Sequence, residues 1–238
     1  MDDFLVNNET YKKLIARNIP IYLFEEHNMA LAVWGNESYQ QGRPLTLVTL
    51  DAHTDTHAPF NQKYFIRYGN GHEYSLEHPY IQSIIKDKHY RISDFRFTDV
   101  FKLSEIIDNS EQIQTAYFFG YIDKYIVISH SNNESSKVMQ DEDIYEGYDA
   151  KYISKDDMFN ANLELTKPYI LDIDLDFFIS KKTLNKRFIE WINPIVQNAA
   201  VITIAKEPRY FNRLKVDMNF SNEEALQLVI KIIQDALK

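Results

Sequence analysis

Short apolar runs, rich in β-branched and aromatic residues, recur along the 238-residue chain and are the feature that most constrains its fold. Strands that are apolar on both faces must be covered on both faces, and their alternation with helices is typical of parallel sheets. The pattern therefore predicts an α/β protein of three layers, α/β/α, with a mostly parallel central sheet. The predicted strands are IPIYLF (19–24), PLTLVTL (44–50), TAYFFGYI (115–122), YIVIS (125–129), PYILDIDL (168–175) and AVITIA (200–205).

Helix-like stretches separate these runs, and the last of them, at the C-terminus, opens with Ser221 followed by Glu224, which is a capping box. No linker-like stretch or internal repeat marks a boundary, so one domain spanning 1–238 is expected. The polar, acidic segment 131–161 is interpreted as a long excursion that could serve as an active-site lid. The predicted helical stretches are EHPYIQSIIKDKH (77–89), TDVFKLSEIID (98–108), KKTLNKRFIEWINPIVQN (181–198) and SNEEALQLVIKIIQDALK (221–238).

Composition excludes several classes of function. The chain has no cysteine, which rules out disulfides, thiolate zinc sites and a cysteine nucleophile. A formal net charge of −9 argues against nucleic acid as a partner. The N-terminal MDDFLVNNETYKK does not resemble a signal peptide, and no apolar run is long enough to span a bilayer, so a soluble, cytoplasmic protein without a membrane partner is expected. Whether the chain forms a homo-oligomer stays open.

Polar residues of the metal-ligand type follow one of the predicted buried strands. Asp51, His53 and Asp55 alternate in LVTLDAHTDTHAP, and an extended backbone points every second side chain to the same side. In parallel sheets, ligands bind beyond the carboxyl ends of the strands. The three side chains can therefore converge on one metal ion.

A second carboxylate cluster ends another strand. Asp172, Asp174 and Asp176 alternate with apolar residues in YILDIDLDFF. Burial of an unpaired carboxylate costs several kcal/mol, so a cation must compensate the three charges. The two clusters together offer more carboxylates than one divalent ion needs, which favours two ions. Oxygen-rich ligation with one or two imidazoles suits manganese, and a pair of ions can lower the pKa of a bridging water enough to give hydroxide at neutral pH.

DAHTD (51–55) and ILDIDLD (170–176) resemble the two signature motifs of the arginase and ureohydrolase superfamily, whose members hydrolyse guanidinium groups at a binuclear manganese centre. The histidine of FEEHN (24–28) stands where that family has a further histidine ligand. The resemblance implies that Asp51 and Asp172 bridge the two ions and that Asp176 orients ligands or the backbone. The implied ligands are His27 and Asp55 on one ion, His53 and Asp174 on the other, and the bridging Asp51 and Asp172.

The resemblance also implies catalytic and substrate-binding residues. YGNGHE (68–73) is similar to the arginase segment G-N-x-H, so His72 would be the proton shuttle to the leaving amine and Asn70 would help to hold the substrate. Glu207 in VITIAKEPRY would bind the guanidinium group, and Asp123 in GYID would bind a free α-amino group. Asp55 would orient the metal-bridging hydroxide that attacks the guanidinium carbon.

EEHN, DAHTD and DIDLDFF together look more like a divergent branch that includes peptide arginases. These enzymes convert arginine side chains to ornithine, with release of urea, in ribosomally made precursor peptides. The implied cofactor is two Mn²⁺, and the implied partner is an arginine-containing precursor peptide. A ureohydrolase of free arginine or agmatine is the second candidate within the same fold. Two functions outside guanidinium hydrolysis also stay open: a metal-dependent deacetylase, whose usual single-zinc ligand set matches less well, and a non-catalytic, metal-stabilised binding module.

Overall fold

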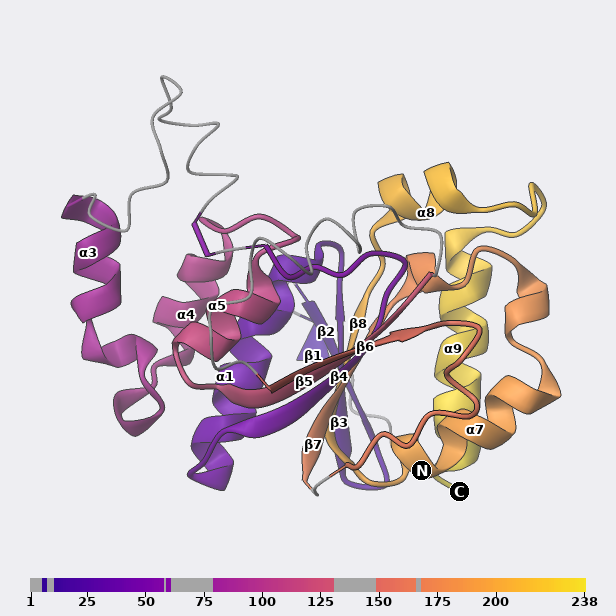
Figure 1. The fold of residues 1–238 in the computed structure, drawn as a ribbon, viewed down its shortest axis with the longest axis horizontal. Coiled ribbons are helices and arrows are strands. Elements are labelled where there is room, and N and C mark those ends of the chain that lie inside the picture. Colours follow the sequence, from indigo (N-terminus) through magenta and orange to yellow (C-terminus); the bar gives the residue numbers. More distant parts are fainter. Residues whose placement is uncertain (1–5, 8–10, 58, 61–78, 131–148, 166–167) are drawn as a thin grey trace.

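The strands of the protein form one mostly parallel sheet. The computed structural model describes residues 6–7, 11–57, 59–60, 79–130, 149–165 and 168–238, and in these ranges eight strands pair in the order β1-β2-β3-β8-β7-β4-β5-β6 (Figure 1). The strands from β3 to β6 in this order are parallel, while β1 and β2 are antiparallel additions at one edge. The strands are β1 (Val6–Asn7), β2 (Tyr11–Ala16), β3 (Ile19–Phe24), β4 (Leu45–Leu50), β5 (Ile122–Ser129), β6 (Asp149–Ser154), β7 (Tyr169–Asp174) and β8 (Ala199–Ala205).

Helices cover both faces of this sheet, which confirms the predicted three-layer α/β/α class (Figure 1). One face packs against α1 (Ala30–Gln41), α3 (Pro79–Lys86), α4 (Phe97–Ser104) and α5 (Gln112–Phe118). The other packs against α7 (Lys186–Val196), α8 (Pro208–Leu214) and α9 (Asn222–Ala236). Short 3-10 helices are η1 (His27–Met29), η2 (Lys88–Tyr90), η3 (Ile92–Asp94), η4 (Leu175–Phe177) and η5 (Lys181–Thr183). No helix in the described ranges is long and apolar enough to cross a membrane.

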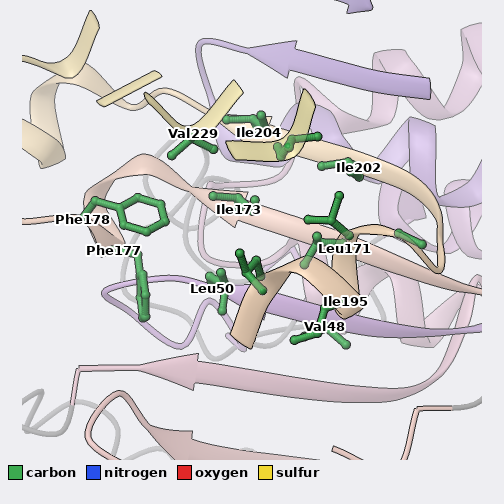
Figure 2. Close-up of a cluster of buried hydrophobic side chains, with 14 of the residues drawn as sticks. Val48, Leu50, Leu171, Ile173, Phe177, Phe178, Ile195, Ile202, Ile204 and Val229 are labelled. Atoms are coloured by element: carbon green, nitrogen blue, oxygen red, sulfur yellow. The ribbon is translucent and has the colours of Figure 1, made fainter. Parts of the chain in front are cut away.

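The buried strands follow from their apolar, β-branched sequences. Alternate residues of β4 face opposite layers, so that Val48 and Leu50 join the core on the α7 and α9 side, whereas Leu45 and Leu47 join the core on the α1 side. Figure 2 shows the first of these cores, in which Leu171 of β7 and Ile202 of β8 continue the layer begun by Val48. Central strands buried on both faces are expected of a parallel sheet.

One predicted strand is wrong. The predicted strand TAYFFGYI spans residues 115–122, but its first four residues belong to helix α5. The next strand, β5, begins only at Ile122, the last residue of the predicted run. Gly120 adopts a positive φ of 79°, and the N–H of Tyr121 donates to the carbonyl of Ala116, 2.8 Å away. This is a Schellman ending, for which a glycine is the usual residue. The aromatic residues suggested a strand, but Gly120 marked the end of a helix.

Three strands at the margins of the sheet, β1, β2 and β6, were not predicted, because they are short or carry polar residues. β2 pairs with β3 through a turn in which Arg17 and Asn18 have positive φ, a geometry typical of a two-residue hairpin. β6 lies inside the predicted excursion 131–161 and pairs in parallel with β5, so residues 149–154 are sheet, whereas 131–148 lie outside the described residues. Edge strands need not be apolar on both faces, and charge on them prevents further pairing.

The predicted start of the C-terminal helix is confirmed. The N–H of Glu224 donates to the hydroxyl of Ser221, 3.1 Å away, at the first turn of α9. The carboxylate of Glu224 pairs with Lys181 instead of returning to the Ser221 backbone, so only half of the capping box forms.

Replacement of this cap should destabilise the fold measurably. Ser221→Ala removes the acceptor for the Glu224 N–H and is expected to lower the free energy of unfolding by about 1 kcal/mol. Ser221→Asp restores an acceptor and should stay close to the wild type. Urea denaturation followed by circular dichroism measures both variants, and equal losses in the two would contradict the capping role.

Candidate metal centre

Acidic and histidine side chains converge at the carboxyl edge of the sheet. β3, β8, β7 and β4 are consecutive neighbours, and the register that pairs Phe24 with Ala205 and Ala205 with Asp174 brings their carboxyl ends level. The chain leaving each strand therefore places its polar residues at the same edge, as the sequence predicted. These residues are His27 after β3, Asp51, His53 and Asp55 after β4, Asp174 and Asp176 at the end of β7, and Glu207 after β8.

Asp51 lies between two groups of ligand-type atoms. Its Oδ2 is 3.5 Å from Nδ1 of His27, which is in turn 2.9 Å from Oδ2 of Asp55. Its Oδ1 is 3.6 Å from Nδ1 of His53, which is 3.1 Å from Oδ2 of Asp176. Each group of three offers atoms close enough to hold one ion, and Asp51 belongs to both. Buried His and Asp side chains that could hold a metal ion are thus present in the folded chain.

A third group joins the first. His27, Asp174 and Glu207 also offer ligand atoms close together, and Oδ2 of Asp174 is 3.5 Å from Nδ1 of His27. Glu207 accepts a hydrogen bond from the backbone N–H of His27 at 3.1 Å. The region around the His27 ring is therefore lined by carboxylates from three strand ends.

Several buried polar atoms at the site are poorly satisfied by hydrogen bonds. Nδ1 of His27, Oδ2 of Asp51 and Oδ2 of Asp176 make no well-formed hydrogen bond within the described residues, and their near neighbours are other ligand-type atoms, such as Oδ2 of Asp55 at 2.9 Å from Nδ1 of His27. A buried polar atom left unsatisfied costs roughly 1–3 kcal/mol, and more when the group is charged. These atoms belong to the groups that share Asp51, so a divalent cation bound there would satisfy them.

Asp172, predicted as a bridging ligand, lies outside the groups of ligand-type atoms in the described residues. It lies two residues before Asp174, one full pleat deeper in the sheet. Thr49 and Thr203 are its direct neighbours on the adjoining strands, and their hydroxyls donate to its two oxygens at 2.8 and 2.6 Å. The remaining contact of Asp172 is to Nε2 of His27, at 2.7 Å. This contact holds the imidazole with Nδ1 turned toward the ligand groups.

Asp176, predicted only to orient ligands or the backbone, belongs to the ligand group of Asp51 and His53. Besides its contact with His53, its Oδ1 accepts from the backbone N–H of Ala52 at 3.1 Å. The N–H of Asp176 donates to Oδ1 of Asp174 within the turn of η4. Asp174 and Asp176 thus form the pair at the edge, two residues later in DIDLD than the predicted pair.

Other side chains hold the ligands in position. Nε2 of Gln112, at the start of α5, donates to Oδ2 of Asp55 at 2.7 Å. Asn28 donates to the carbonyls of Ser104 and Ile107, which fixes η1 and its His27 against α4. No motif marked Gln112, Thr49 or Thr203, because each comes from a different element and meets the site only through the fold.

Backbone strain coincides with the site. Asp55 and Glu207 have positive φ, at 50° and 37°, a region that non-glycine residues rarely occupy. Strain of this kind costs of order 1–3 kcal/mol and tends to be found at functional sites. At Glu207 it turns the chain sharply between β8 and α8, with Pro208 opening the helix.

Crowding raises the proton affinity of the buried carboxylates. Burial, and then the charges of Asp55 and Asp176, raise the pKa of Asp51 well above its ordinary value. Burial also raises the pKa of Asp174 well above its ordinary range, with the charges of Asp176 and Asp51 adding to the effect. The pKa of Glu207 rises to about 8, mainly through burial. A cation at this edge would oppose all three shifts.

The histidines respond to the same carboxylates. Burial would lower the pKa of His27, but Asp172 and Asp55 raise it well above its ordinary value. Hydrogen bonds to Asp176 and Asp51 raise the pKa of His53 to about 11. In the absence of a metal ion, protonated imidazoles thus compensate part of the negative charge.

Of the three other predicted residues, one lies away from the site and two are not described. Asp123 is exposed near the amino end of β5, and because β5 is parallel to β4, it lies at the opposite edge of the sheet from Asp51, so its predicted role is corrected. His72 and Asn70 lie outside the described residues.

A pocket adjoins the ligand groups at Glu207. It has a volume of about 280 Å³, and its walls carry the carboxylates of Glu26, Asp108 and Glu207 together with Arg209. Tyr210, which also lines it, meets the ring of His53 edge-on at 5.8 Å between centroids. We call this cavity the acidic pocket. Its charge favours a cationic group beside the candidate metal centre.

Comparisons with known proteins do not assign the chain to a family, since no family model and no curated protein matches it. The similarity of DAHTD and DIDLDFF to arginase motifs stays a prediction carried by short segments. The geometry of the site is therefore the main guide to function.

Replacement of Asp172 tests its role. Asp172→Asn should weaken metal binding about 10–100-fold, the usual effect of losing a hydrogen-bond partner of a metal-ligating histidine. Asp174→Asn, which removes a ligand-type side chain at the edge, should lose bound metal more completely. Asp123→Asn is the matched control and should bind like the wild type. Calorimetric titration with Mn²⁺ measures all three, and complete loss of metal in Asp172→Asn alone would restore it as a bridging ligand.

The raised pKa of Glu207 makes the metal-free protein sensitive to alkaline pH. Its pKa rises from 4.5 in the unfolded chain to about 8, so the folded state binds the extra proton between these values. The resulting stabilisation is complete below about pH 4.5 and is lost as pH rises through 8. Thermal melts from pH 5 to 8 should show the melting temperature of the wild type falling relative to that of Glu207→Gln. A parallel course of the two curves would contradict the assignment.

Proposed function

We propose that the protein is a binuclear manganese hydrolase that converts arginine side chains of a peptide to ornithine and releases urea. The observation that carries the proposal is the position of Asp51, with one carboxylate oxygen facing each of two groups of ligands. A shared carboxylate between two ligand groups is the arrangement that two neighbouring ions require.

The donor set supports manganese over zinc. Two imidazoles and several carboxylates surround the site, whereas zinc sites tend to carry more nitrogen or sulfur ligands. Nδ1 of His27 and Oδ2 of Asp51 are buried without a well-formed hydrogen bond among the described residues, which supports a divalent ion as their common partner. The residues that would hold the ions are His27, Asp51, His53, Asp55, Asp174 and Asp176.

The acidic pocket supports a guanidinium substrate. A planar guanidinium prefers a carboxylate that can accept two parallel N–H bonds, and Glu207 is buried at the boundary between the pocket and the ligand groups. A cation held there would also favour the charged form of Glu207, whose pKa is otherwise raised to about 8. Glu26 and Asp108 extend the negative lining toward the pocket entrance.

Bound manganese ions would supply the nucleophile by lowering the pKa of a shared water molecule. Glu207 would hold the guanidinium so that its carbon faces the ligand groups. Asp55, fixed by Gln112, would accept a hydrogen bond from the attacking oxygen. Formation of the new C–O bond and cleavage of the bond to the side-chain nitrogen, with a proton delivered to that nitrogen, yield urea and the ornithine amine. His72 is the proposed proton donor.

A peptide substrate agrees with the location of Asp123. Recognition of free arginine would need a group for its α-amino end, and the residue predicted for that purpose lies at the opposite edge of the sheet. Within a peptide the α-amino group is already an amide, so no such group is required.

Free arginine remains the second candidate because of Arg209. Its guanidinium lines the acidic pocket, where it could bind the α-carboxylate of the free amino acid. Agmatine lacks that carboxylate, so Arg209→Gln should reduce turnover of free arginine and spare turnover of agmatine. Equal effects on both substrates would remove this role from Arg209.

Urea release by the manganese-loaded protein tests the proposed reaction. We expect arginine-containing peptides to give urea, with ornithine detected inside the peptide by mass spectrometry. Asp51→Ala should lower the rate by more than about 100-fold, because changes to mere hydrogen-bond partners of metal ligands already cost about 10–100-fold. The exposed Asp123→Ala serves as the control and should retain the wild-type rate.

The remaining outcomes separate the candidate functions. Urea from small molecules alone would indicate a ureohydrolase of arginine or agmatine. Release of acetate from acetyl-lysine peptides would indicate a deacetylase, and tight metal binding without turnover of any of these substrates would indicate a binding module. Full activity of Asp51→Ala would show that the centre is wrongly assigned.

A further inference from the structure

A second pocket at the carboxyl edge has the opposite charge. It lies where β6 ends and α7 begins and has a volume of about 330 Å³. Its walls carry the cations of Lys155, Lys182 and Arg187 and one carboxylate, that of Asp156. We call this cavity the basic pocket. This local excess of positive charge contrasts with the formal net charge of −9 of the chain.

Two cations of this pocket are not neutralised by acidic neighbours. Lys182 and Arg187 form no ion pair with another residue in the described ranges, although the lysines beside them do: Lys181 pairs with Glu224, and Lys186 pairs with Glu190. The Arg187 guanidinium lies 4.2 Å above the ring of Phe159, and this stacking leaves the N–H groups at its edge able to donate.

The third cation is partly buried. Nζ of Lys155 donates to the carbonyl of Phe177 at 2.7 Å and lies 3.1 Å from Nε2 of His130. These partners are neutral, as is the ring of Phe177, whose centroid lies 4.4 Å from the same Nζ, so none of these contacts neutralises the charge of the ammonium. Burial lowers the pKa of Lys155 to about 8, and a bound anion would oppose that shift.

The start of α7 adds to the positive potential. Asn185 caps the helix by accepting from the N–H of Phe188, and the first turn carries no acidic residue. It carries Lys186 and Arg187 instead, although cations are unfavourable at the positive end of the helix dipole. An anion in the basic pocket would relieve this repulsion. The hydroxyls of Ser180 and Thr183, on the same wall, are further donors.

From this geometry we propose that the basic pocket is a binding site for an oxyanion, either a carboxylate or a phosphate group. Lys155, Lys182 and Arg187 supply the charge, and the hydroxyls supply neutral hydrogen bonds. Phe177, whose carbonyl holds Lys155, directly follows Asp176, so the bound anion would lie beside the candidate metal centre. The proposal does not depend on the hydrolase activity, because its test measures binding alone.

Two double variants of equal charge test the site. Lys182→Gln combined with Arg187→Gln removes two cations from the pocket, and Lys181→Gln combined with Lys186→Gln removes two cations from the same segments outside it. Inorganic phosphate and glutarate are each titrated calorimetrically into the manganese-loaded full-length protein. Melting temperatures establish that both variants are folded.

The wild type should bind at least one of the two anions, and the pocket variant should bind it about tenfold more weakly or worse, as expected for the loss of charge-assisted hydrogen bonds. The control variant should match the wild type. Preference for glutarate would identify a carboxylate ligand, and preference for phosphate a phosphate ligand. The proposal fails if neither anion binds, if the two variants weaken equally, which indicates net charge alone, or if the pocket variant binds normally, which places the anion on the metal ions.

Discussion

Mutual repulsion among buried carboxylates is the constraint on which the arrangement of this protein depends. Asp51, Asp174, Asp176 and Glu207 come from three strand ends and are all shielded from water. Such a group is tolerated only when protons or cations compensate the charge. Burial and neighbouring charges accordingly raise the pKa of Asp51 and Asp174, and the nearby carboxylates raise the pKa of His53 to about 11. Metal binding must therefore displace protons, which couples affinity to pH.

The depth of each aspartate in the sheet decides whether it is satisfied by hydrogen bonds or lies among the ligand-type atoms. Asp172 and Asp174 share one strand and one face, but two residues of extended chain separate their levels by roughly 6–7 Å. At the deeper level, parallel pairing places Thr49 and Thr203 on either side of Asp172, and Trp34 donates to Thr203 from behind. This row satisfies Asp172 without a metal ion and so frees it to hold His27. At the level of Asp174, β4 has ended at Leu50, and the partner on β8 is Ala205, whose side chain cannot donate a hydrogen bond.

The same distinction explains what could be predicted from the sequence. The central strands and the convergence of His27, Asp51 and His53 follow from apolar runs that end in polar residues, and both were predicted. The sequence could not show that Asp176, and not Asp172, lies among the ligand-type atoms, because the aspartates of DIDLD repeat every two residues. Only the pairing with neighbouring strands shows that Asp172 lies deeper in the sheet. Gln112 was missed because it belongs to helix α5, and the aromatic residues that follow it led to the prediction of a strand in this region.

Pockets of opposite charge flank the ligand groups at one edge of the sheet. The acidic pocket adjoins Glu207 after β8, and the basic pocket adjoins Lys155 after β6, with β7, β4 and β5 between those strands in the sheet order. Separation across these strands keeps the two sets of charges from neutralising each other. If the proposed oxyanion site holds, a substrate with a guanidinium and a nearby acidic group would be oriented by both ends. A reversed orientation would place like charges together, so the polarity of the edge would discriminate against it.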